Sequence, residues 1–161
     1  ALFRLGAPAS VLLPGGEADM VWTVGNHGFE LVLSANVPKL IRSFLPGEFG
    51  PLLAGGKKPE LWAIHPGGRG IIDAVEEVCG LSSVETRASR EVLRRYGNMS
   101  SASILFVMEE LAREHGRRPA GSGPAGGLAV AFGPGLSAEL LPFSLAHDPV
   151  RARGGREAVH A

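Results

Sequence analysis

The sequence has little of what several classes of protein depend on. It contains a single cysteine, Cys79, so an internal disulfide is impossible and a reducing compartment is indicated. Its 16 basic side chains match its 16 acidic ones, so no net charge attracts nucleic acid or an anionic membrane. No apolar run reaches the roughly 18 residues that suggest a membrane span. These absences predict a soluble cytoplasmic protein that binds neither nucleic acid nor a membrane.

The two ends of the chain also lack expected features. Residues Ala1 to Arg4 contain neither an initiator methionine nor the layout of a signal peptide, which favours an internal start such as that of a gene fragment. Residues 146–161 lack apolar periodicity and are expected to be disordered. Between the ends, a composition that is 45% hydrophobic and 20% charged is typical of a globular domain.

Short apolar stretches alternate with amphipathic ones along the chain. Strands are expected at 8–13, 20–24, 29–34, 61–64, 127–132 and 138–145, and helices at 37–45, 70–78, 86–96 and 99–114. Pro46 and Gly47 are expected to end the first helix. Gly80 is expected to cap the second. Because helices lie between strands, the pattern predicts an α/β layered domain.

The helix expected at 99–114 is divided by charge. Its first turns, from Met99 to Met108, carry no charged residue, whereas Glu109, Glu110, Arg113 and Glu114 follow. This division predicts a buried start and an exposed end. The serines and alanine in the first turn are small enough for a ligand to approach the backbone, and the helix N-terminus offers free N–H groups.

Two polar residues stand at the ends of apolar elements. His65 joins an apolar run to the turn Pro66-Gly67-Gly68, and Asn98 follows Gly97 before the uncharged helix. Alone, the histidine is more often a satisfied polar group at a strand end, and the asparagine a helix cap. The asparagine can do both, since capping uses its oxygen and leaves the NH₂ group available. Together, an imidazole N–H and an amide N–H aimed at one carbonyl oxygen make an oxyanion hole.

Five motifs occur in a family's order, and they carry a resemblance. The chain resembles the C-terminal half of type III polyketide synthases, the chalcone and stilbene synthase-like branch of the thiolase superfamily. This resemblance implies a thiolase-like half, a layered mixed five-stranded sheet with helices on both faces. The matching motifs are Gly28 to Glu30 with Val37-Pro38 downstream, His65 to Gly68, Arg90 to Leu93, Gly97 to Ala102, and Phe132 to Leu136.

The resemblance also divides the chain. Residues 1–19 become a truncated junction with a missing N-terminal half, residues 20–145 a chalcone and stilbene synthase C-terminal-like domain, and residues 146–161 the tail. The nucleophilic cysteine of the family belongs to the half that is not matched. Cys79 lies late on an amphipathic helix with no neighbour that lowers its pKa, so it is expected to be structural.

Roles for individual residues follow from the resemblance. His65 is implied as the catalytic histidine that supports the cysteine thiolate and polarises a thioester carbonyl. Asn98 is implied to stabilise the enolate that forms when malonyl-CoA loses carbon dioxide. Phe29 is implied as a gatekeeper between the CoA tunnel and the acyl cavity, and Ser100 as a residue lining that cavity. Gly133, Pro134 and Gly135 are implied to shape the cavity wall. No histidine spacing indicates a metal site.

The activity implied for the complete enzyme is that of an acyltransferase. It condenses an acyl-CoA starter with malonyl-CoA by decarboxylative Claisen chemistry, giving products such as alkylpyrones or alkylresorcinols. The implied enzyme is a homodimer that takes CoA thioesters as substrates and needs no cofactor. Two alternatives remain open at this point. One is a β-ketoacyl-ACP synthase-like fragment, and the other is a catalytically silent remnant or a half that pairs with another chain.

Overall fold

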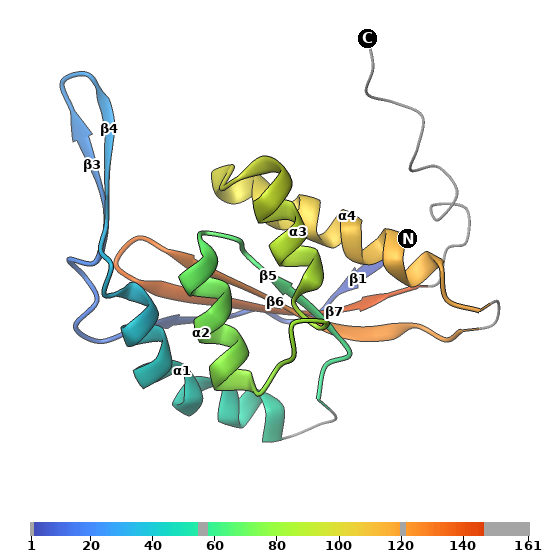
Figure 1. Ribbon diagram of the computed structural model, residues 1–161. Coiled ribbons are helices and arrows are strands. Elements are labelled where there is room, and N and C mark those ends of the chain that lie inside the picture. Colours follow the sequence, from blue (N-terminus) through green and yellow to red (C-terminus); the bar gives the residue numbers. More distant parts are fainter. Residues whose placement is uncertain (1, 55–57, 120–121, 147–161) are drawn as a thin grey trace, which may run out of the picture.

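A computed structural model describes residues 2–54, 58–119 and 122–146, and these form three layers (Figure 1). A five-stranded sheet forms the middle layer. Helices α1 (Val37–Ala54) and α2 (Arg69–Cys79) cover one face, and α3 (Arg87–Tyr96) and α4 (Ser103–Gly116) cover the other. A short 3-10 helix, η1 (Ser100–Ala102), leads into α4.

The sheet is mixed in direction. Strand β6 (Ala125–Gly133) pairs antiparallel with β7 (Ser137–Leu145) and parallel with β5 (Leu61–Ile64). On the other edge of β7 lie β1 (Phe3–Leu5) and β2 (Ala9–Leu12), both antiparallel to it. This mixed sheet with helices on both faces confirms the predicted α/β, thiolase-like arrangement.

Strand β5 is buried on both faces, as expected of a parallel strand between helix layers. Trp62 and Ile64 pack in the cluster that contains α1 and α2, and Ala63 packs in the cluster that contains α3 and α4. All three side chains are fully buried. The strand therefore ends in a fixed position, directly before His65.

Helix α1 does not end at Pro46, contrary to the prediction. It continues to Ala54. Val37, Ile41 and Leu45 recur every four residues and are buried in the core, whereas Pro46 is exposed. A proline inside a helix costs about 3 kcal/mol. Burial of each large aliphatic side chain contributes about 1.5–3 kcal/mol. The packed face fixes the first half of α1 on the core, and the helix continues past the break that local propensity predicts.

The burial predicted for the start of the last long helix is also wrong for this chain. Leu105 and Phe106 in its uncharged part are 65% and 42% exposed, whereas His115 and Gly116 at its end are buried. The buried face of α4 is formed by Ser103, Val107, Leu111, Ala112, His115 and Gly116. The absence of charged residues in this segment therefore does not indicate which side of the helix faces the core.

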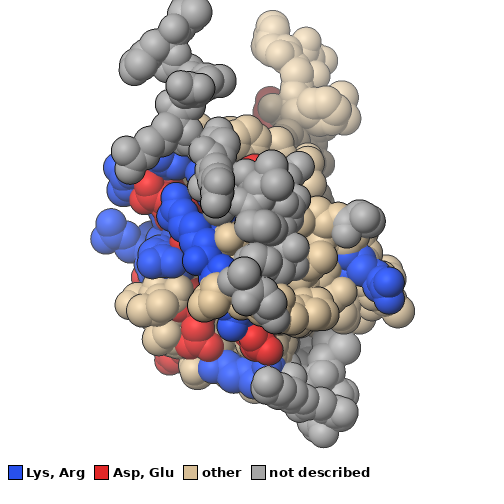
Figure 2. Space-filling view, turned by 90° about the vertical axis from the view of Figure 1, so that its right-hand side faces the viewer, with Lys and Arg blue, Asp and Glu red and all other residues tan. Residues whose placement is uncertain are grey.

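Strands β3 (Met20–Gly25) and β4 (Gly28–Leu33) form a separate hairpin that projects from the body of the molecule (Figure 1). Its register places Met20, Trp22 and Val24 opposite Leu33, Leu31 and Phe29, so one face is wholly apolar. Figure 2 shows acidic and basic side chains interspersed on the body, whereas the projecting hairpin carries few. In the described part of the chain, no helix is both long and apolar enough to span a bilayer.

Candidate active site

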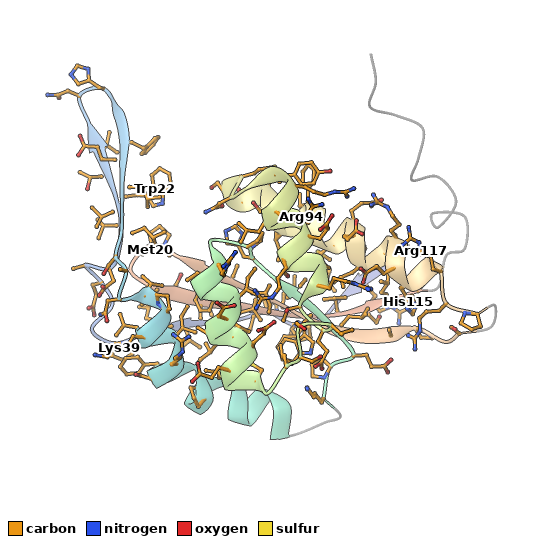
Figure 3. The ribbon with its side chains drawn as sticks, in the orientation of Figure 1. Met20, Trp22, Lys39, Arg94, His115 and Arg117 are labelled. Atoms are coloured by element: carbon orange, nitrogen blue, oxygen red, sulfur yellow. The ribbon has the colours of Figure 1, made fainter. Side chains whose placement is uncertain are left out.

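A cavity of about 450 Å³ lies where the β3–β4 hairpin meets the end of β5 and the start of η1. Its volume falls in the range of roughly 300–1,000 Å³ that is typical of small-molecule sites. Met20 and Trp22 project from the hairpin toward the body and close one side (Figure 3). The lining residues are Met20, Trp22, Leu31, Leu33, His65, Gly67, Ile71, Asn98, Ser100, Ser101, Ile104, Ala131, Phe132, Gly133 and Pro134.

His65 enters the cavity from the loop that follows β5. Its backbone N–H donates to the carbonyl of Val130 at 2.8 Å, which extends the pairing of β5 with β6. The Gly67 N–H donates to the His65 carbonyl at 2.9 Å and turns the loop back. Burial lowers the pKa of His65 below 6.5, so the ring is neutral at pH 7. A neutral imidazole carries one N–H donor and one acceptor nitrogen.

Gly67 keeps the space beside the His65 ring open. A Cβ atom at this position would lie 3.5 Å from Cδ2 and 3.8 Å from Nε2 of His65. Any longer side chain would therefore sit against the imidazole edge that lines the cavity. Glycine leaves that edge accessible to a ligand.

Asn98 reaches the same cavity from the other direction, between α3 and η1. Its Oδ1 accepts the N–H of Ser100 at 2.9 Å, a local bond at the turn into η1, whereas the N-cap of η1 itself is Met99. Its Nδ2 donates to the carbonyl of Gly67 at 3.2 Å. The NH₂ group is therefore not wholly free, because one of its two N–H groups is bound to the His65 loop. This bond brings the two predicted polar residues to one place.

The other predicted site residues divide into two groups. Ser100, Gly133 and Pro134 line the cavity with His65 and Asn98. Ser100 has a φ of 57°. Residues other than glycine adopt this backbone conformation at a cost of about 1–3 kcal/mol, and such strained residues occur often at functional sites. Gly135 lies in the β6–β7 turn with a φ of 74° and does not line the cavity.

Phe29 lies outside the lining. It is 71% exposed on the hairpin, and its ring packs edge-on against Trp22 with 5.7 Å between ring centroids. Since Trp22 does line the cavity, Phe29 contacts a residue of the cavity wall. Its role as a gatekeeper stays a prediction.

Sequence reasoning missed most of the apolar wall. His65 and Asn98 share the cavity lining with five large apolar side chains, Trp22, Leu31, Ile71, Ile104 and Phe132. The alternation of Met20, Trp22 and Val24 was the available signal, because such residues share one face of a strand. The direction of that face depends on how the hairpin meets the sheet, which no local pattern shows.

The chemistry available here is stabilisation of an oxyanion in a largely apolar cavity. A neutral imidazole and a side-chain amide supply N–H donors, and such donors act strongly where water is excluded. Cys79 does not line the cavity, and burial raises the pKa of its thiol to about 12. It is therefore a neutral thiol at physiological pH and a poor nucleophile. Within residues 2–54, 58–119 and 122–146, no three His, Cys, Asp or Glu side chains are grouped as metal ligands.

Comparison with known proteins gives the same answer as the motifs. The family model for chalcone and stilbene synthases, C-terminal domain, matches residues 4–144. A solved structure, PKS-I from the brown alga Ectocarpus siliculosus, is 28% identical and superimposes with a TM-score of 0.77. The match covers 89% of this chain and 39% of the algal chain. The chain belongs to the chalcone and stilbene synthases, as a C-terminal domain of a type III polyketide synthase.

Proposed function

We propose that this domain supplies the oxyanion-stabilising half of a type III polyketide synthase active site. The observation that carries the proposal is that His65 and Asn98 line one cavity, joined through the Gly67 carbonyl. When a malonyl thioester loses carbon dioxide, its carbonyl oxygen becomes the oxyanion of an enolate. The imidazole N–H and the amide N–H stabilise that charge, so the barrier falls in the step where the charge develops.

The covalent half of the reaction belongs to a cysteine outside these 161 residues. Cys79 is the sequence's one cysteine, and its position and raised pKa exclude it from the role. In the complete reaction the external cysteine carries the acyl starter as a thioester. The enolate carbon attacks that thioester carbonyl, a carbon–carbon bond forms, and the cysteine thiolate leaves. His65 supports the thiolate, and no cofactor besides the CoA thioester substrates takes part.

The substrates we propose are an acyl-CoA starter and malonyl-CoA. The walls formed by Trp22, Leu31, Ile104 and Phe132 suit an apolar acyl chain, and His65 and Asn98 supply polar donors in the same cavity. The products we propose are of the alkylpyrone or alkylresorcinol type. We place the enzyme in the cytoplasm and expect a homodimer when the catalytic unit is complete.

Family membership decides against a β-ketoacyl-ACP synthase-like fragment. A catalytically silent or pairing half remains a second candidate, because the nucleophile that the chemistry needs is not Cys79. The two hypotheses differ in whether His65 and Asn98 contribute to catalysis once a cysteine-bearing half is present.

The deciding experiment combines the purified chain with a fatty acyl-CoA and malonyl-CoA, with and without the cysteine-bearing half of a related enzyme. Mass spectrometry follows polyketide products and the acetyl-CoA that decarboxylation releases. The proposal expects no product from the chain alone and product from the combination. His65→Gln and Asn98→Ala should each lower the rate about 100-fold or more. His27→Gln, at the exposed hairpin turn, is the matched control. Equal rates in all variants would leave only the hypothesis of a catalytically silent half.

A further inference from the structure

Helix α3 contacts the protein on both sides of the loop that carries His65. That loop runs from the end of β5 at Ile64 to the start of α2 at Arg69. Ser89 of α3 reaches the strand side, and Arg90, the next residue, reaches the α2 side. Neither residue lines the cavity.

Ser89 holds the backbone directly before His65. Its side chain is fully buried, and its Oγ accepts the N–H of Ile64 at 3.0 Å. The next N–H along, that of His65, donates in the opposite direction to β6. Because β5 has no strand partner on its outer edge among the described residues, Ser89 takes the place of a neighbouring strand for this one N–H. The residue before the catalytic histidine is thus fixed by α3.

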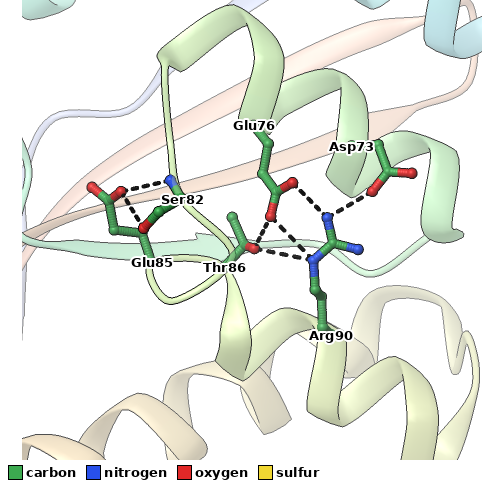
Figure 4. Close-up of polar contacts among 6 residues, drawn as sticks. All are labelled: Asp73, Glu76, Ser82, Glu85, Thr86 and Arg90. Carbon is green, nitrogen blue, oxygen red and sulfur yellow. Dashed lines mark hydrogen bonds and ion pairs between the residues drawn. The ribbon is translucent and has the colours of Figure 1, made fainter.

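Arg90 holds the helix that follows the loop. One terminal nitrogen, Nη2, lies 2.6 Å from Oδ1 of Asp73 and 2.6 Å from Oε2 of Glu76, and Nε lies 3.1 Å from the other Glu76 oxygen (Figure 4). Thr86, buried at the start of α3, donates to the same Glu76 carboxylate. A planar guanidinium with several bonds fixes direction as well as distance. Arg90 therefore sets where α2 begins relative to α3.

Asn98 lies in the segment that directly follows the same helix. Helix α3 ends at Tyr96, and Asn98 follows two residues later, with its amide bound to the carbonyl of Gly67 inside the His65 loop. Both members of the polar pair are thus located by α3. We propose that Ser89 and Arg90 are positioning residues that set the His65 imidazole relative to the Asn98 amide. The proposal rests on the proposed function only for what the two polar groups do.

The test uses the whole 161-residue chain and needs no substrate, so failure of polyketide synthesis does not affect it. Ser89→Ala removes the acceptor for Ile64, and Val92→Ala is its control. Val92 is buried on the same helix and belongs to its apolar packing. Arg90→Gln removes the contacts to α2, and Arg94→Gln is its control, because Arg94 pairs with Glu91 on its own helix. Arg90→Lys keeps the charge without the planar fork.

Nuclear magnetic resonance supplies the readouts. After correction for global stability, exchange of the Ile64 amide hydrogen should be about tenfold faster in Ser89→Ala than in Val92→Ala. The His65 ring should titrate closer to its ordinary pKa, and the Asn98 side-chain amide signals should shift, in Ser89→Ala and Arg90→Gln. Arg90→Lys should restore part of the change, and Arg94→Gln should cause none.

Equal exchange and unchanged His65 and Asn98 signals in the variants and their controls would overturn the proposal, and would show that the contacts stabilise the fold without directing the site. If Ser89→Ala does not fold, the comparison of Arg90→Gln with Arg94→Gln decides, since Arg90 is partly exposed.

Discussion

His65 and Asn98 each do local structural work with part of the residue and leave polar atoms for a ligand. The His65 backbone extends the pairing between β5 and β6 while its ring lines the cavity. The Asn98 oxygen accepts the Ser100 N–H at the turn into η1 while its nitrogen meets Gly67. Because one part of each residue is held by the fold, its remaining polar atoms keep a fixed position at the cavity wall without packing on every side.

The burial of His65 predicts a pH dependence of stability. Its pKa is lowered in the folded chain, so the unfolded chain binds a proton more readily at pH values just below 6.5. The free energy of unfolding should therefore fall as the pH drops from about 7.5 to about 5.5, and should fall less in His65→Gln. Urea denaturation at each pH measures both. His27→Gln, at the exposed hairpin turn, is the control variant.

The carboxylates of Glu85 and Glu91 affect stability in a different range of pH. Glu85 and Glu91 have pKa values below 4.5, lowered by hydrogen bonds from Ser82 and Arg94, so their contribution disappears only in more acidic solution. An identical decrease between about pH 7.5 and 5.5 in wild type and His65→Gln would contradict the burial of this ring.

Cys79 should be chemically quiet. With a pKa of about 12 in place of 9.0, its thiolate fraction at pH 8 is lower by about a thousandfold. Alkylation by iodoacetamide, followed by mass spectrometry, should be slow in the folded chain and rapid after denaturation in urea. Rapid alkylation without denaturant would show an activated thiol and reopen its candidacy as a nucleophile.

At the scale of elements, the β6–β7 pair depends on one close approach. A Cβ atom on Gly127 would lie 2.2 Å from Cζ of Phe143, so the ring packs directly on the glycine. Gly127→Ala should lower the free energy of unfolding by about 1–3 kcal/mol, because the ring must move within a packed core. Urea denaturation gives the change.

The neighbouring glycine offers the control for that substitution. Nothing lies within 4 Å of a Cβ placed on Gly126, which is exposed on the same strand. Gly126→Ala should leave stability unchanged or raise it by about 0.4–1 kcal/mol through the unfolded state. Equal losses in the two variants would mean that the Phe143 ring is not what limits position 127.

The β3–β4 hairpin carries several large apolar side chains that the rest of the described chain leaves exposed. Isolated two-stranded hairpins are marginal in water. Here the base of its apolar face closes the cavity, whereas Val24 and Phe29 nearer the tip are 79% and 71% exposed. The hairpin thus connects the cavity wall with exposed apolar side chains.

At the scale of the whole molecule, the exposed apolar side chains of the hairpin and of α4 predict association. Val24, Phe29, Leu105 and Phe106 are all large, apolar and exposed. Soluble monomers seldom expose apolar patches of more than a few hundred Å². The purified chain should bind a hydrophobic dye and sediment as an oligomer, and the double variant Val24→Thr, Leu105→Gln should do less of both.

A cysteine-bearing half from a related enzyme should suppress the same behaviour if it covers these residues. A chain that stays monomeric at high concentration, binds no dye and melts cooperatively would show a self-sufficient module. The reading of the domain as one half of an active site would then be wrong.

The sequence by itself determined the features that depend on neighbours along the chain. The α/β alternation, the Gly80 cap of α2 and the antiparallel β6–β7 pair all follow from periodicity and turn residues, and the structure confirms them. The placement of His65 after a buried strand and of Asn98 before a helix also follows from local pattern. Backbone hydrogen bonding and side-chain alternation act over a few residues, so they are visible in the sequence.

Only the tertiary structure decided which parts meet. It continued α1 through Pro46 to Ala54, contrary to the break that the local sequence predicts. It turned Leu105 and Phe106 outward, and it brought the apolar face of the hairpin over His65 and Asn98 to form the cavity. These outcomes depend on contacts between segments distant in sequence. Such contacts are set by packing of the whole chain, and no single window of residues contains them.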